Sequence, residues 1–429
     1  MIALGLDIGT TSVCGVLFDA QSGTCLQALT LQNDSFLTDR AAFERVQDVQ
    51  KIVCRVDELL TRLYREDVGV IGVTGQMHGI LYLDREGQPL SPLYTWQDGR
   101  GNLQDANGVR YADRLRGASG FGTVTDLYNA EHALVPQEAA VFCTIHDYIA
   151  MRLAGQKTPL VHTSDAASLG AYDAREHAFT IENARLPRVT KHFDIIGSYR
   201  NTPVCVAIGD NQASFLSAAG DDCMLINVGT GSQVSIPVKG YHEALGLETR
   251  PLNGDDYILV GSSLCGGRAF AILEHFFADV VQMATGSAPD SLYAQMDAVL
   301  REDIQTSVKM DTRFSGTRQD PTVCGSITGL REDNFRAADL LVAAIDGMSR
   351  ELHDMYRASG VRVKRITGSG NGLRRNPALR RVTEKMFGMP LRFPAHREEA
   401  AVGAAMSALC AVGEYRDLRD LAAHISFEV

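Results

Sequence analysis

The sequence lacks several features that would place the chain at a membrane or outside the cell. No apolar run approaches the roughly 18 residues that a membrane span needs. Asp7 interrupts the short apolar run at the start, and no basic segment precedes it, so we expect no signal peptide. Nine cysteines are scattered without a CxxC pair, which is typical of reduced thiols. These absences predict a cytoplasmic protein without a membrane partner.

Signatures of several enzyme and binding classes are also missing. There is no HExxH, and the 11 histidines show no metal-ligand spacing. A GxGxxG after the first strand is absent, which argues against an NAD-dependent dehydrogenase. The net charge of −11 argues against nucleic acid as a partner. An anionic ligand stays compatible with that charge, because backbone N–H groups can build a local anion site.

What is present is an ordinary globular composition with alternating strand and helix patterns. Apolar residues make up 45% and charged residues 22% of the chain. The length of 429 residues is enough for two or three domains. We expect an α/β protein with a domain boundary near Gly220, which divides the chain into residues 1–219 and 220–429.

Two short segments with the same pattern open the two halves of the chain. In the first, a strand ending at Asp7 leads through the turn Gly9-Thr10-Thr11-Ser12 into a second strand. In the second, the turn is Gly229-Thr230-Gly231-Ser232. Small residues let backbone N–H groups converge on an anion, and Asp7 would repel phosphate unless a cation lay between them. The pattern therefore favours a Mg²⁺-bridged nucleotide, with an ordinary hairpin turn as the alternative. Its recurrence suggests two related halves that face a shared cleft.

Asp210 is the candidate catalytic residue. It follows the apolar run 204–208, which we expect to be a buried strand, and precedes a helical segment at 212–220. In open α/β sheets, ligands bind at the carboxyl ends of strands. A carboxylate in that position can accept the proton of a substrate hydroxyl. The alternative is that Asp210 only caps the helix.

Other polar segments follow predicted strands. Gln76-Met77-His78 comes after the strand 68–73, and Trp96-Gln97-Asp98-Gly99-Arg100 holds the only tryptophan. An indole beside charged groups suits a polyol, because the ring packs on carbon and the charged groups bind hydroxyls. The alternatives are a structural histidine and a core tryptophan beside an ion pair. We expect a loop at 162–170, and a glycine loop at 368–372 that permits close approach of a ligand.

Taken in order along the chain, these segments resemble the FGGY family of carbohydrate kinases over essentially the whole length. The resemblance rests on six segments: Asp7 to Val13, Gly75 to Gly79, Thr95 to Arg100, Thr144 to Tyr148, Gly209 to Ser214 and Gly368 to Gly370. It implies two actin-like ATPase (ribonuclease H-like) domains, each a mixed sheet flanked by helices, with a cleft between them. It also implies a small-molecule sugar and MgATP as the ligands.

The resemblance further implies ATP-dependent phosphorylation of the terminal hydroxyl of a ketose, with Asp210 as general base. The Thr95 to Arg100 and Thr144 to Tyr148 segments are similar to those of family members that phosphorylate sedoheptulose at position 7. The Gly75 to Gly79 segment is shared with members that phosphorylate xylulose, which gives the alternative substrate. A catalytically idle regulator that binds sugar or nucleotide is a further alternative. The sequence does not set the oligomeric state, a homodimer being one option.

Individual positions take their implied roles from the family's motifs. The implied sugar site comprises Gln76, Met77, His78, Trp96, Asp98, Arg100, Asp210 and Asn211. The implied ATP site comprises Gly9, Thr10, Thr11, Ser12, Gly229, Thr230, Gly231, Ser232, Gly368, Gly370, Asn371 and Asn376. Asp7 and Asp210 would hold Mg²⁺ through water. Cys14 departs from the pattern, because many relatives have a lysine there that would help neutralise phosphate charge.

Overall fold

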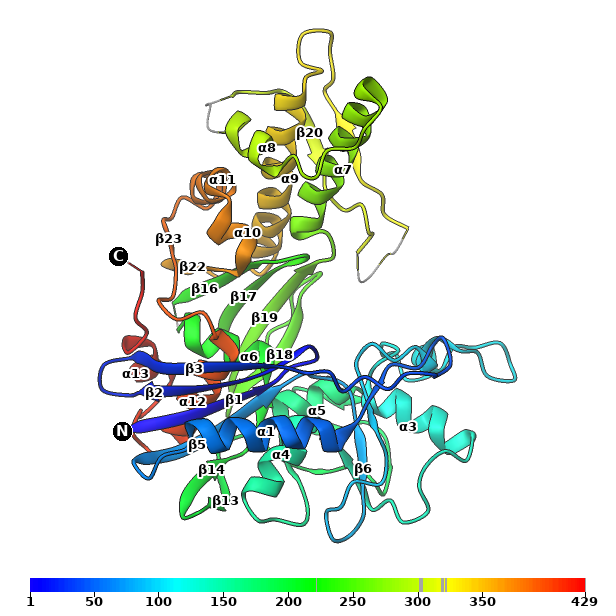
Figure 1. Ribbon diagram of the computed structural model, residues 1–429, viewed down its shortest axis with the longest axis vertical. Helices are drawn as coiled ribbons and strands as arrows, with labels where there is room; N and C mark the ends of the chain where they lie inside the picture. Colours follow the sequence, from blue (N-terminus) through cyan, green and yellow to red (C-terminus); the bar gives the residue numbers. More distant parts are fainter. Residues whose placement is uncertain (221, 301–303, 318–319, 321, 429) are drawn as a thin grey trace.

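The computed structural model describes residues 1–220, 222–300, 304–317, 320 and 322–428, and it folds into two halves around one mixed sheet each (Figure 1). The first sheet has the order β13-β14-β5-β1-β2-β3, with β15 paired to β5. Neighbours β1, β2 and β3 are antiparallel, whereas β5 runs parallel to β1. Its strands are β1 (Ile2–Ile8), β2 (Ser12–Asp19), β3 (Thr24–Gln32), β5 (Val68–Gly75), β13 (Ile195–Tyr199), β14 (Thr202–Cys205) and β15 (Ile208–Gly209).

The second sheet repeats this pattern of pairing. Its order is β18-β19-β17-β16-β22-β23, with β16, β17 and β19 antiparallel and β22 parallel to β16. Its strands are β16 (Cys223–Val228), β17 (Ser232–Lys239), β18 (Glu248–Asn253), β19 (Asp256–Ser263), β22 (Arg365–Ser369) and β23 (Leu391–Arg392). The predicted fold of two mixed sheets flanked by helices is confirmed. The two small-residue turns lie at equivalent places, between β1 and β2 and between β16 and β17.

Helices cover both sheets. In the first half these are α1 (Val49–Leu63), α3 (Gly122–Glu131), α4 (Ile145–Leu153), α5 (Thr163–Leu169) and α6 (Asp210–Ala218). In the second half they are α7 (Gly266–Thr285), α9 (Ala337–Ala358), α10 (Gly370–Arg375) and α11 (Pro377–Phe387). The expected loop at 162–170 is wrong: it contains α5, whose first turn is capped by the ring of His162 accepting from the N–H of Ser164.

The remaining elements are short and connect these layers. They are β4 (Val46–Gln47), β6 (Leu81–Leu83), β7 (Leu93–Tyr94), the 3₁₀ helix η1 (Arg100–Asn102), α2 (Tyr111–Arg114), β8 (Val141–Cys143), β9 (Leu160–His162), β10 (Tyr172–Asp173), β11 (Ala178–Phe179), β12 (Arg188–Thr190), α8 (Tyr293–Val299), β20 (Lys309–Asp311), β21 (Ser326–Thr328) and α13 (Leu418–Ala423). Within the part of the chain that the structure describes, no helix is long and apolar enough to cross a bilayer.

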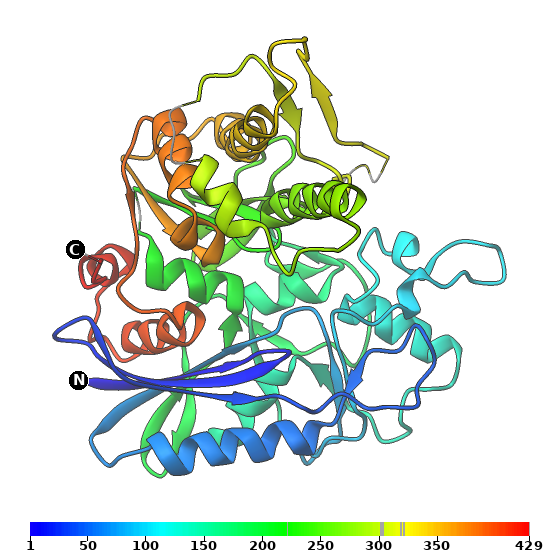
Figure 2. The same cartoon turned by 45° about the horizontal axis from the view of Figure 1, so that its top comes forward.

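Helix α12 (Glu399–Ala411) follows the second sheet in sequence but packs on the first, beside β1 and β5 (Figures 1 and 2). Glycines make this close approach possible. A Cβ atom on Gly72 would lie 1.8 Å from the carbonyl oxygen of Ala404, and one on Gly403 would lie 1.8 Å from that of Ala213 in α6. The small residues of this helix thus allow it to pack closely on α6, which begins with Asp210.

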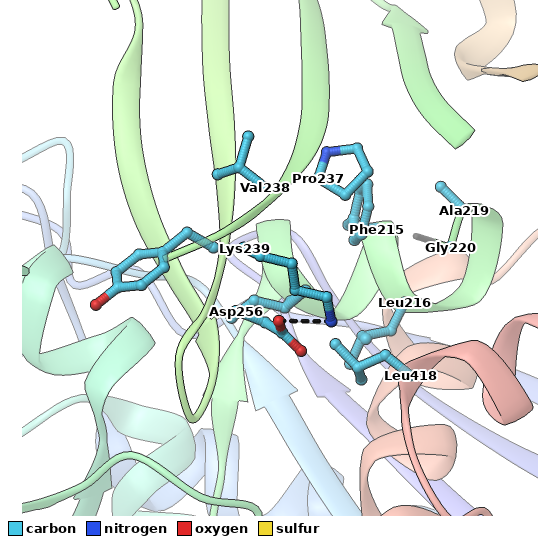
Figure 3. A pocket seen from close by; sticks show the side chains of 11 residues that line it. Phe215, Leu216, Ala219, Gly220, Pro237, Val238, Lys239, Asp256 and Leu418 are labelled. Atoms are coloured by element: carbon cyan, nitrogen blue, oxygen red, sulfur yellow. Dashed lines mark ion pairs between the residues drawn. The ribbon is translucent and has the colours of Figure 1, made fainter. Parts of the chain in front are cut away.

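The two halves also meet at the carboxyl end of α6. Figure 3 shows a small pocket there, with Phe215 of α6 beside Pro237 of β17 and Leu216 beside Leu418. Its volume is about 50 Å³, and an ion pair of 2.7 Å between Lys239 and Asp256 borders it. The junction is thus apolar and nearly filled, so it joins the two halves rather than offering a ligand site.

Candidate functional site

A cleft of about 760 Å³ between the two halves contains most of the predicted site residues. Strand pairing explains why they meet, since β1, β5 and β15 run parallel and end at the same edge of the sheet. The predicted residues that line it are Asp7, Gly9, Thr10, Gln76, Met77, His78, Trp96, Asp210, Asn211, Gly229, Thr230, Gly231 and Ser232.

Asp210 stands in the first turn of α6, with its carboxylate at the cleft. Gly209 is the N-cap of this helix, so the capping alternative for Asp210 is not what the structure shows. Burial raises the pKa of Asp210, while the charges of His146 and Arg250 and the N–H of Asn211 act in the opposite direction. The carboxylate therefore lies at the cleft without serving as the cap, which leaves its oxygens to meet a ligand.

Asp7 lies near the end of β1, close to two other carboxylates. Burial and the charges of Asp210 and Glu398 raise the pKa of Asp7 to about 7. Negative groups that crowd in this way favour a bound cation, and carboxylate oxygens are the ligands that Mg²⁺ uses. The donor set at Asp7 and Asp210 therefore fits a divalent cation with its water ligands.

A closed ring of hydrogen bonds fixes the first small-residue turn. The indole N–H of Trp96 donates to the Thr10 hydroxyl at 3.0 Å, and this hydroxyl donates to Oε1 of Gln76 at 3.1 Å. The amide of Gln76 donates to Gln47 at 2.8 Å, and Gln47 donates back to the carbonyl of Thr10 at 2.8 Å. Trp96 remains 47% exposed, so its ring is held in place while a face stays available to pack on a ligand.

The backbone conformation of His78 and the contacts of its ring with Ser168 and Phe121 hold this side chain in one orientation. Its φ of 75° is unusual for a residue other than glycine, which marks a constrained position. Its N–H donates to the hydroxyl of Ser168, and Nδ1 lies 2.7 Å from the carbonyl oxygen of Ser168. The ring stacks on Phe121 at 4.8 Å between centroids. A proton on Nδ1 leaves Nε2 as the acceptor nitrogen of the ring.

The two residues after Asp210 carry side-chain amide oxygens that lack hydrogen-bond donors. Oδ1 of Asn211 and Oε1 of Gln212 are buried and have no hydrogen-bond partner among the described residues. Gln212 is held from its other end, because Nε2 donates to the carbonyl of Pro251 at 3.0 Å. Unpaired buried acceptors are costly, and Asn211 lines the cleft. A ligand with several hydroxyl groups would supply the missing donors.

A fully buried cluster lies behind the base. Nε2 of His146 is 2.9 Å from Oδ1 of Asp165, and Asp147 accepts from the Thr144 hydroxyl at 2.7 Å in the capping box of α4. Burial lowers the pKa of His146, and burial with the charge of Asp210 raises the pKa of Asp165 well above its usual range. The sequence pattern contained the Thr144 to Tyr148 segment but gave no reason to pair it with Asp165.

Some of the predicted site residues lie elsewhere. Asp98 and Arg100 do not line the cleft; both are buried, and Nε of Arg100 donates to Asp98 at 2.7 Å. The Asp98 carboxylate also accepts from the N–H of Arg45 at 3.0 Å. The pair is therefore hydrogen-bonded within its own part of the protein. Their predicted place in the sugar site stays a prediction, and in the structure the pair fixes the segment that carries Trp96. Sequence spacing alone does not say which way a charged pair faces.

The remaining predicted nucleotide residues are not among those that line the cleft: Thr11, Ser12, Gly368, Gly370, Asn371 and Asn376. Asn376 caps α11 by accepting from the N–H of Leu379 at 2.9 Å. Gly370 has a φ of 79° and contacts the end of β16, where a Cβ atom would lie 2.5 Å from the carbonyl oxygen of Val228. The expected glycine loop is instead the end of β22 and the start of α10, and it contacts the strand that leads into the second small-residue turn.

Nine further residues line the cleft: Ser214, Leu225, Asn227, Gln233, Arg250, Ser262, Ser263, Leu264 and Ala400. Asn227 carries a signal that sequence analysis could have used, because it is a polar residue in an otherwise apolar strand that ends at a small-residue turn. Arg250 and the serines of β19 carry no such signal. Their place depends on the pairing of β18 and β19, which brings separate segments together.

Cys14 points to the same face of the sheet as Asp7, because the two residues pair directly across β1 and β2. The thiol is 3% exposed, and burial together with Glu398 raises its pKa to about 12. The first turn therefore lacks the positive side chain expected there, and the thiol stays protonated and neutral.

Comparison with known proteins gives matches over nearly the whole chain. Residues 2–229 match the N-terminal domain, and residues 222–412 the C-terminal domain, of the FGGY family of carbohydrate kinases. The chain is 28% identical to a sedoheptulokinase of Mus musculus, covering 94% of this chain and 96% of the relative. It is 25% identical to a xylulose kinase of Streptomyces coelicolor, covering 95% and 87%. A solved ligand-bound xylulose kinase from Lactobacillus acidophilus has a TM-score of 0.82 at 20% identity, covering 100% of this chain and 93% of that one.

Proposed function

The chain belongs to the FGGY family of carbohydrate kinases, and from this premise we propose that it transfers the terminal phosphoryl group of ATP to a ketose, sedoheptulose, to give sedoheptulose 7-phosphate. The single observation that carries the reaction type is Asp210, a carboxylate at the cleft between two small-residue turns. The similarity to sedoheptulokinase over nearly the full length supports the choice of sugar.

In the proposed reaction Asp210 accepts the proton of the sugar's terminal hydroxyl as its oxygen attacks the γ-phosphorus. The bond from that phosphorus to the bridging oxygen of ADP breaks, and ADP leaves. Phosphoryl transfer asks the protein mainly for positioning and charge neutralisation. The N–H groups of the turns Gly9–Ser12 and Gly229–Ser232 would hold the phosphates, and Mg²⁺ bound through water at Asp7 would neutralise their charge.

The sugar would lie on the first half of the cleft. The exposed ring of Trp96 would pack on its carbon atoms, and His78 would bind a hydroxyl. The unpartnered oxygen of Asn211, which lines the cleft, would accept from a further hydroxyl. A buried acceptor without a donor suits a polyol better than an apolar ligand.

Xylulose is the second candidate substrate, and similarity to xylulose kinases in sequence and fold favours it. The two sugars differ in chain length, so the test is a direct comparison. ADP release is measured with MgATP and sedoheptulose, xylulose, ribulose or glycerol in parallel. We expect the highest kcat/KM with sedoheptulose. A higher value with xylulose would replace the proposed substrate, and no turnover with any of them would favour an idle regulator.

A further inference from the structure

Arg250 is the only lysine or arginine among the described residues that line the cleft. It lies on β18, the edge strand of the second sheet, with its side chain 14% exposed. Nε and Nη2 of Arg250 donate to Oε2 of Glu248 at 3.1 and 2.6 Å. Glu248 is about half exposed, so it holds the guanidinium from the solvent side. The result is a fixed guanidinium whose charge is largely balanced by its own neighbour.

The position of β18 places Arg250 on the sugar side of the cleft. The strand packs against α5, and Ser168 of α5 contacts the ring of His78. Gln212, in the first turn of α6, donates to the carbonyl of Pro251, the residue next to Arg250. Strand β18 therefore contacts α5, which holds the ring of His78, and α6, which carries Asp210 and Asn211, although it belongs to the C-terminal half.

The charges around the two cleft carboxylates agree with this placement. The charge of Arg250 acts on Asp210, whereas the charges that act on Asp7 are those of Asp210 and Glu398. Asp7 marks the phosphate side, next to the first turn. Arg250 thus lies nearer to Asp210 than to Asp7, which agrees with the hydrogen bond that Gln212 of α6 donates to the neighbouring residue Pro251.

We propose that Arg250 binds a hydroxyl group of the sugar from the C-terminal half, and that its pairing with Glu248 makes this subsite select a neutral ketose over a sugar acid. The inference rests on the proposed function and deepens it. An arginine without a partner attracts carboxylates, whereas one already paired with a carboxylate carries little net charge and still donates hydrogen bonds. A sugar that contacts both halves would also favour closure of the cleft before phosphoryl transfer.

The first test compares Arg250→Gln with wild type. We expect the KM for sedoheptulose to rise about ten- to a hundredfold, as when one partner of a charge-assisted hydrogen bond is removed, with the KM for MgATP changed less than about twofold. Arg65→Gln, which removes an exposed arginine paired with Asp67, is the matched control and should behave as wild type. A sugar KM within about twofold of wild type in Arg250→Gln would overturn the assignment.

The second test examines the role of Glu248 by removing its charge. Removing its charge in Glu248→Gln leaves Arg250 with a net positive charge, so inhibition by gluconate, a sugar acid, should strengthen at least about fivefold. Unchanged gluconate inhibition would contradict the neutral-sugar part of the proposal.

A third variant separates sugar binding from a role in phosphate neutralisation. If Arg250 instead supplied the positive charge that Cys14 does not, adding Cys14→Lys to Arg250→Gln would restore kcat. We expect no rescue of the sugar KM, and restoration of both parameters would overturn the proposal.

Isothermal titration of sedoheptulose without ATP separates this inference from the proposed function. If wild type binds none of the tested sugars, the proposed function fails, and this inference fails with it. If wild type and Arg250→Gln bind sedoheptulose equally, only the role of Arg250 is wrong.

Discussion

At the residue scale, the cleft is organised by carboxylates that are expensive to ionise without a cation. Asp7 lies near the end of β1 and Asp210 directly follows β15, at the same edge of the sheet, and Glu398 adds a third negative charge near Asp7. Carboxylates that crowd in this way favour a divalent cation between them. This crowding of carboxylates should therefore lower the stability of the unliganded protein where Asp7 is ionised.

Asp7 gives the prediction on pH. Its folded-state pKa of about 7 lies above the value of about 3.9 in an unfolded chain. The folded state therefore binds the proton more tightly, and this group's contribution to stability is present below pH 4 and lost as the pH rises through 7. Asp7→Asn should raise Tm at pH 8 in EDTA but change it little at pH 4. Scanning calorimetry at both pH values is the measurement, and an equal change at both would contradict the assignment.

His78 gives a prediction on ligand specificity. Its constrained backbone and contacts with Ser168 and Phe121 indicate a ring that is oriented for a purpose other than packing. We expect His78→Ala to weaken sugar binding about tenfold or more and to leave ATP binding near wild type. Titrations with each ligand measure this directly. Loss of ATP affinity with sugar affinity kept would mean that the two sides of the cleft have been exchanged.

Cys14 gives a prediction in which a substitution keeps or increases activity. A lysine at this position would lie beside Asp7 and Glu398 and could reach the phosphate turn. Cys14→Lys should therefore keep or increase kcat, because it adds the positive charge that the first turn lacks. Steady-state kinetics with saturating MgATP measure the effect. A large fall in kcat together with a fall in Tm would show that the buried thiol is needed for packing.

At the scale of elements, α12 joins the last part of the chain to the first sheet. Its glycine contact with α6 leaves no room for a side chain, since the Cβ atom would lie 1.8 Å from a backbone oxygen. Gly403→Val should destabilise the protein by about 1–3 kcal/mol, the usual cost of overpacking. It should also reduce kcat, because α6 begins with Asp210. Thermal denaturation and kinetics on the same preparation check both effects, and an unchanged Tm would contradict the packing argument.

Local sequence patterns predicted most elements where periodicity was strong. The hairpins and the strand before Gln76 were confirmed within a few residues. The pattern failed at α5, whose small polar residues form a helix that packs against β18 and the surrounding elements. Such contacts are tertiary and leave no local signal.

At the scale of the whole molecule, the repeated sheet order explains why the site lies between the halves. Each small-residue turn ends an equivalent pair of strands, so the two turns face one cleft. The sequence predicted this because each turn is a short, contiguous motif. It did not predict Arg250, Ser262 or the burial of Asp98, because these depend on which edge strands come together and which way side chains face.

A site shared by two halves should make ligand binding stabilise the whole fold. A ligand that binds only the native state at 100 times its Kd adds about 2.7 kcal/mol. We expect sedoheptulose and MgADP together to raise Tm more than either alone, because each would hold one side of the closed cleft. Differential scanning fluorimetry measures this. Equal shifts with one or both ligands would mean that the two sites are not coupled through closure.

The central claim is that Asp210 is the general base for phosphoryl transfer to a sugar, and the most direct measurement is kcat of Asp210→Asn. We expect kcat to fall about 10²–10⁴-fold in a protein that keeps its Tm and binds MgATP as wild type does. Turnover within about tenfold of wild type, with the same sugar and an intact fold, would contradict it.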